Sequence, residues 1–140
     1  LPLDAPRRKI AEEVKEFYIL LTPDPSNNRI PVRMNLVNTS DGKLKPGETL
    51  WFNMTEHRIV AKLGENNLSV TPKGVAVSRD PIADSGYYEA KFAYQPRAEG
   101  KFHRITEQMW WHDAKSRHIG FIVSSGGRLP KIYFYRDFRM

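Results

Sequence analysis

Apolar and polar residues alternate along most of the chain after residue 28. In residues 32–36, Val32, Met34 and Leu36 lie on one side of an extended chain, and Arg33 and Asn35 lie on the other. The same period of two recurs in short segments that are separated by turn residues. We therefore predict strands over residues 32–36, 49–54, 58–63, 68–70, 75–77, 88–94, 102–106, 108–112, 119–123 and 131–134.

Short strands spaced by about 8–12 residues are typical of sandwiches and barrels. The sequence shows no internal repeat and no low-complexity tract. The predicted fold class is therefore mostly β, as a single antiparallel β-sandwich with a short N-terminal helix.

The first 28 residues follow a different pattern. Asp4, Ala5 and Pro6 resemble a helix start, with Asp as the cap and Pro in the first turn. Apolar residues then recur at helical spacing, namely Ile10, Val14, Phe17, Tyr18 and Leu21. This spacing predicts a helix over residues 7–20, although residues 17–21 fit a strand equally well.

Residues 22–28 (TPDPSNN) interrupt both patterns, because two prolines and two asparagines disfavour helix and strand alike. We place a boundary there. Residues 1–28 are expected to form an N-terminal helix or arm with a proline-rich link. Residues 29–140 are expected to form the β-sandwich domain.

Two segments are similar to immunoglobulin-like repeats of the filamin and macroglobulin type. The first is residues 44–52 (LKPGETLWF), where a Pro-Gly turn leads into a strand. The second is residues 84–92 (DSGYYEAKF), where an Asp-x-Gly-x-Tyr turn opens a strand, followed by Gly100-Lys101-Phe102. Gly permits a positive φ in such turns, and Tyr packs at the corner of the sandwich. The resemblance implies an Ig-like fold and says almost nothing about function.

A second resemblance is to ecotin-type serine-protease inhibitors, which are periplasmic β proteins of similar size. It rests on the order of Gly47-Glu48-Thr49-Leu50, His57-Arg58, Lys62-Leu63, and Arg128-Leu129-Pro130 with Tyr133. The Gly-Trp-Gly-Tyr segment and the cysteine pair of that family have no match here, so no inhibitory residues are transferred.

Charge and cysteine content narrow the function. The formal net charge is +6, and residues 97–140 hold nine basic and four acidic side chains. Such a basic protein could face an anionic partner, or the charge could simply keep it soluble. The absence of cysteine excludes disulfides, thiolate metal sites and thiol nucleophiles. It suits a bacterial periplasmic or cytosolic protein better than a small eukaryotic secreted one. The expected localisation is periplasmic or secreted, and no apolar run is long enough for a membrane span.

Catalytic and cofactor motifs are absent from the sequence. There is no Gly-x-Ser-x-Gly elbow and no phosphate-binding glycine loop. His103, His112 and His118 lack the spacing of metal ligands on one helix or strand face. We therefore expect no catalytic residues, no metal site, no cofactor and no enzymatic activity.

Residues 109–118 (MWWHDAKSRH) carry the strongest sign of recognition. Trp110 and Trp111 must face opposite sides of a strand, so one is expected in the core and the other at the surface or beneath a covering element. An exposed Trp beside cations could stack on a partner. The candidate binding residues are Trp110, Trp111, His112, Lys115, Arg117, His118 and Arg128.

The function expected from this reasoning is a non-enzymatic protein-interaction module, part of a larger envelope or extracellular assembly, with a protein partner or a homo-oligomeric contact. One alternative is a nucleic-acid-binding β domain with a basic, aromatic face that includes Arg104, Lys115, Arg117, Arg128, Lys131, Arg136 and Arg139. The other alternative is a serine-protease inhibitor of the ecotin-like type.

Overall fold

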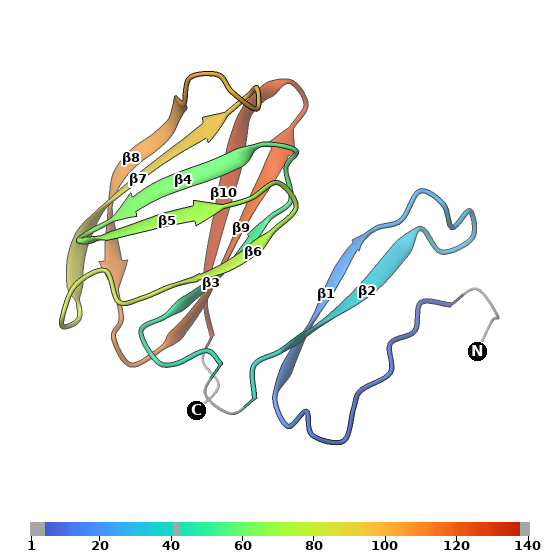
Figure 1. Ribbon diagram of the computed structural model, residues 1–140. Helices are drawn as coiled ribbons and strands as arrows, with labels where there is room; N and C mark the ends of the chain where they lie inside the picture. The colour runs from blue at the N-terminus through green and yellow to red at the C-terminus, as the bar shows by residue number, and fades with distance from the viewer. Residues whose placement is uncertain (1–4, 41–42, 138–140) are drawn as a thin grey trace. The chain divides into compact units, whose positions relative to one another are not determined.

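The structure is a computed structural model that describes residues 5–40 and 43–137. All regular elements in these residues are β-strands (Figure 1). They are β1 (Phe17–Pro23), β2 (Val32–Asn38), β3 (Thr49–Asn53), β4 (Arg58–Leu63), β5 (Asn66–Val70), β6 (Val75–Ser78), β7 (Gly86–Gln95), β8 (His103–His112), β9 (Arg117–Ser125) and β10 (Arg128–Asp137). The mostly β prediction is confirmed. Within the described residues, no helix has the length and apolar character needed to cross a bilayer.

The expected N-terminal helix is not present in the described residues. Between residues 7 and 16 the only backbone turn joins Val14 N–H to the Ala11 carbonyl, at 3.1 Å. The Ser40 hydroxyl accepts hydrogen bonds from the backbone N–H groups of Lys15 and Glu16. Residues 17–21 take the alternative strand conformation, because they pair along their whole length with β2. The expected cap, Asp4, lies outside the described residues.

The chain forms two compact units, Leu1–Lys43 and Leu44–Met140. The sequence placed the boundary after residue 28, but residues 24–31 are the connection between two paired strands. Asp24 N–H donates to the Pro31 carbonyl at 2.9 Å, and the Asn27 side chain accepts from Arg29 N–H and Ile30 N–H. Strand β2 therefore belongs with β1 in the first unit.

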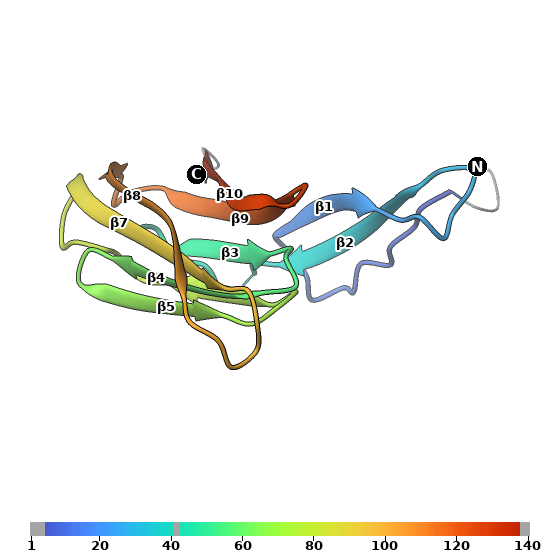
Figure 2. The same ribbon diagram turned by 90° about the horizontal axis from the view of Figure 1, so that it is seen from above.

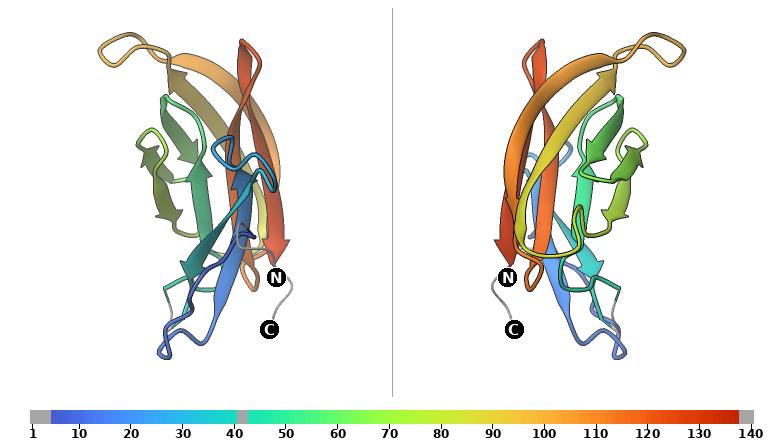
Figure 3. Two further views of the ribbon diagram at one scale, coloured as in Figure 1. Left: turned by 90° about the vertical axis from the view of Figure 1, so that its right-hand side faces the viewer. Right: turned by 90° about the vertical axis from the view of Figure 1, so that its left-hand side faces the viewer.

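The second unit consists of two four-stranded sheets, ordered β10-β9-β3-β6 and β5-β4-β7-β8. Neighbouring strands are antiparallel except β3 and β9, which are parallel. Figures 2 and 3 show β4 and β5 in one layer and β9 and β10 in the other. Residues 102–112, expected as two strands, form the single strand β8, because a register shift at Phe92 and Ala93 accommodates one extra residue opposite β7.

A hydrophobic core joins the two sheets. Trp51 of β3 is fully buried at its centre, with its ring 5.2 Å from Phe92 and 5.7 Å from Phe134. Its indole N–H donates to the Ser78 hydroxyl at 2.9 Å, which satisfies the buried polar group. Gly120 lies directly against the Trp51 ring and leaves the space that the ring occupies. Burial of each large apolar side chain contributes about 1.5–3 kcal/mol.

Candidate functional site

The two adjacent tryptophans of β8 lie on opposite sides of their sheet, as the alternation predicts. Trp110 packs against the core, with its ring 5.1 Å from Phe134 and 5.5 Å from Phe92. The Trp111 side chain is 53% exposed and meets the edge of Tyr87 at 5.0 Å. Of the two, Trp111 is the exposed ring, and Trp110 is partly buried.

The two candidate histidines are buried together at one end of the core. His112 Nε2 lies 2.6 Å from Asp80 Oδ1, and the His112 and His118 rings are 5.7 Å apart. His118 stacks on Phe134, and its Nδ1 has no hydrogen-bond partner among residues 5–40 and 43–137. Burial, together with the neighbouring His112, lowers the pKa of His118. Both rings therefore face the interior and not a surface partner.

The candidate cations do not gather on one surface. Lys115 is exposed in the turn between β8 and β9, and Arg128 is exposed at the first position of β10. Arg117 instead pairs with Asp137, at 3.6 Å between Nη2 and Oδ2. Arg139, a member of the basic set in the nucleic-acid alternative, lies outside the described residues. The structure thus divides the seven candidate binding residues between the core and separate parts of the surface.

A larger surface, which the sequence reasoning missed, lies on the outer side of the β10-β9-β3-β6 sheet. In strand register, one row across this sheet is Tyr135, Ile119, Leu50 and Val77, and the next is Tyr133, Phe121, Phe52 and Val75. We call these eight residues the uncharged face. They face away from the core, since Trp51, Ala76, Ile122 and Phe134 alternate with them and pack inside.

The uncharged face is continuous and well packed. Phe52 and Phe121 stack at 5.3 Å, and Tyr135 meets Phe121 at 6.1 Å. Leu50 and Phe52 are buried, whereas the four residues of the two edge strands, Val75, Val77, Tyr133 and Tyr135, are 43–55% exposed. The Arg117–Asp137 pair adjoins one end of the face, and Lys131 adjoins the other.

The sequence did contain a signal for this face. Strand β3 has the unbroken apolar run Leu50-Trp51-Phe52, and β10 has the run from Ile132 to Tyr135. A strand that is apolar on both sides is typical of a sheet covered on both faces.

The outer side of the β5-β4-β7-β8 sheet has a different character. Tyr87 and Met109, 67% and 62% exposed, lie beside Trp111 at one end of it. Further along the same strands is a groove of about 570 Å³, lined by Val60, Ala61, Lys62, Asn67, Leu68, Ser69, Lys91, Phe92, Ala93, Arg104 and Glu107. We call this surface, from Trp111 to the groove, the mixed face.

Nothing in the described residues forms a group of three His, Asp or Glu side chains that could hold a metal ion. In comparisons with known proteins, no family matched the chain and no curated protein was significantly similar to it.

Proposed function

We propose that this chain is a non-enzymatic protein-interaction module built on an Ig-like β-sandwich, in a larger periplasmic or extracellular assembly. Two sheets around one core support the sandwich. So does the turn at Pro46-Gly47, where Gly47 has a φ of 86° and its N–H bonds to the Ser116 carbonyl at 2.8 Å. This turn belongs to one of the segments that resemble filamin-type repeats.

The uncharged face is the observation that carries the proposal. Interfaces between proteins have an apolar centre that is rich in aromatic residues, with polar groups at the rim. Here Phe52, Phe121 and two tyrosines form such a centre, and Arg117, Asp137 and Lys131 lie at its border. Leaving a contiguous apolar patch in water is unfavourable, and such patches mark contact sites.

The partner that fits this face best is a second copy of the chain. Two copies with a net charge of +6 repel each other, and a contact through the eight uncharged positions brings no like charges directly together. The two sheets would pack face to face, as sheets do in sandwiches, around a two-fold axis that brings the same residues together. The bordering ion pair of Arg117 and Asp137 adds no net charge.

Sedimentation velocity over a range of protein concentrations tests this proposal. The unaltered chain should form dimers as concentration rises, and Val77→Lys or Tyr133→Lys should raise the dissociation constant about tenfold or more. The matched control is Met109→Lys, which places the same charge on an exposed apolar position of the other sheet. A chain that stays monomeric throughout, or an equal effect of Met109→Lys, would overturn the proposal.

A further inference from the structure

The mixed face contains an electrostatic conflict at its centre. Lys62 of β4 and Lys91 of β7 are directly opposite each other in register, and both side chains point outward. Like charges in such cross-strand pairs are destabilising. Proteins keep such unfavourable pairs mainly at functional sites. The opposed lysines therefore indicate a binding role for this face.

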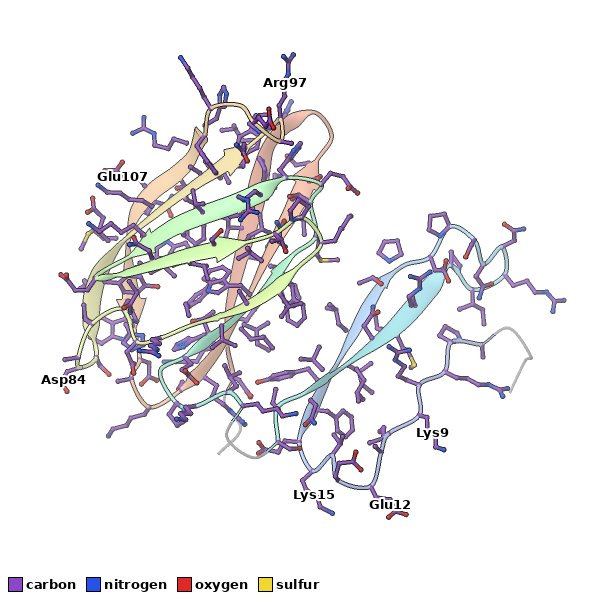
Figure 4. The ribbon with its side chains drawn as sticks, viewed as in Figure 1. Lys9, Glu12, Lys15, Asp84, Arg97 and Glu107 are labelled. Carbon is purple, nitrogen blue, oxygen red and sulfur yellow. The ribbon has the colours of Figure 1, made fainter. Side chains whose placement is uncertain are left out.

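Neighbouring acids relieve only part of this conflict. Lys91 Nζ lies 3.5 Å from Glu89 and 3.6 Å from Glu107, and Arg104 lies 3.4 Å from the same Glu107 (labelled in Figure 4). The Lys62 ammonium group has no ion pair or hydrogen bond with any described residue. The groove lining therefore holds three cations and one carboxylate, and Lys62 has a charge available for an anion.

Aromatic rings lie along the same strands. On the outward side of β8, Glu107, Met109 and Trp111 follow one another at every second residue, so the distance from the groove to Trp111 is about 13 Å. Tyr87 meets Trp111 nearly perpendicularly, at 77°, which holds the Trp111 ring in place. A ligand on this face therefore meets an anion site at one end and an apolar ring at the other.

We propose that the mixed face binds an acidic glycan, with a uronate or sulfate group between Lys62 and Lys91 and a sugar ring against Trp111. The carboxylates favour a glycan over a nucleic acid. Glu107 lies opposite Lys91, and Glu89 lies between Lys91 and Tyr87 along β7; both would repel a phosphodiester chain but accept hydrogen bonds from sugar hydroxyls. Asn67 and Ser69, which also line the groove, suit a hydroxyl-rich ligand.

Titration calorimetry with defined probes tests the proposal on the whole chain. The probes are a uronate hexasaccharide, a sulfated hexasaccharide, a neutral hexasaccharide, a single-stranded DNA of similar length and an acidic octapeptide. At least one acidic hexasaccharide should bind, and the more tightly bound of the two identifies the anionic group. Preference for the DNA with a steep salt dependence, preference for the peptide, or equal binding of the neutral hexasaccharide would overturn the proposal.

Variants place the binding on the mixed face. Lys62→Gln and Trp111→Ala should each weaken acidic hexasaccharide binding about tenfold, as expected when a charge-assisted hydrogen bond or a buried aromatic contact is lost. Lys131→Gln and Tyr133→Ala remove the same groups from the opposite sheet and should leave binding unchanged. Equal losses in both pairs would contradict the site. Because these titrations are compared at a concentration where the chain is monomeric, their outcome does not depend on dimerisation.

Discussion

The outer faces of the two sheets are built by the same alternation and yet differ in chemistry. On the β10-β9-β3-β6 sheet, eight consecutive register positions are uncharged, and two of its rings stack. On the β5-β4-β7-β8 sheet, lysines, glutamates and an exposed aromatic pair share one surface. Inward positions are mostly apolar on both sheets, so they carry the fold. Outward positions are free to differ, so they carry the functional information.

The largest expected difference between inward and outward positions is between the two tryptophans of β8, each replaced in turn by alanine. Trp110→Ala removes a ring that packs on Phe92 and Phe134, and it should lower the free energy of unfolding by about 3 kcal/mol. Trp111→Ala removes only the edge contact with Tyr87, and it should cost less than about 1 kcal/mol. Urea unfolding followed by circular dichroism measures both values, and similar losses would contradict the assigned orientations.

Gly120→Ala tests the close packing of β9 against Trp51 beneath the sheet that carries the uncharged face. A methyl group at this position would overlap the Trp51 ring, so the ring or β9 must move. Overpacking of this kind should cost about 1–3 kcal/mol. The control is Gly100→Ala in an exposed turn, where the nearest atom is Arg97 Cβ at 3.3 Å, and where the change should stay below about 1 kcal/mol. Thermal melting of the two variants compares them, and a larger loss for Gly100→Ala would count against this packing.

The buried His118 should make the stability of the protein depend on pH. The lowered pKa of His118 means that the unfolded chain, with the ordinary value of 6.5, takes up this proton more readily than the folded chain. The contribution of neutral His118 to the free energy of unfolding is therefore fully present above pH 6.5. It is lost as the pH drops from 6.5 towards the lowered pKa. Charged groups near the ring act in both directions, since His112 and Arg136 lower this pKa and Asp113 raises it.

Denaturant unfolding at several pH values between 8 and 5 measures this effect. His118→Phe keeps a ring against Phe134 without a titrating nitrogen, so its stability should vary less with pH over this range. His103→Gln, at an exposed position, should keep the pH dependence of the unaltered chain. A pH dependence that persists in His118→Phe would assign it to another group.

The strand pattern made most of the second unit predictable from sequence. Alternation located β3 to β10, and also β2 of the first unit, to within a few residues, because burial on one side imposes a period of two. The N-terminal segment was misassigned because Phe17, Tyr18 and Leu21 satisfy helical and strand spacing alike. The long-range pairing of residues 17–23 with residues 32–38 resolves this, and no local pattern encodes it.

The candidate site was less predictable, because surfaces are assembled from strands distant in sequence. The uncharged face joins β3, β6, β9 and β10, and only the register places Phe52 beside Phe121. The pairing of the buried His112 with Asp80 likewise needs two segments 32 residues apart. Composition drew attention to residues 109–118 instead, where only Trp111 and Lys115 of the candidate binding residues proved well exposed.

The smallest predicted effect is a change in stability that shows whether Lys62 serves ligand binding or the fold. If Lys62 is present for a ligand, Lys62→Gln should relieve its repulsion with Lys91 and raise the free energy of unfolding by about 0.3 kcal/mol, as expected for an exposed pair. High salt should erase the gain, since it screens the same repulsion. Lys131 faces the uncharged Val123 across the sheet, so Lys131→Gln should not raise the free energy of unfolding. Paired chemical unfolding in low and high salt resolves the difference. A loss of stability in Lys62→Gln would mean that this lysine serves the fold, and the conflict between the two lysines would then no longer support a binding site.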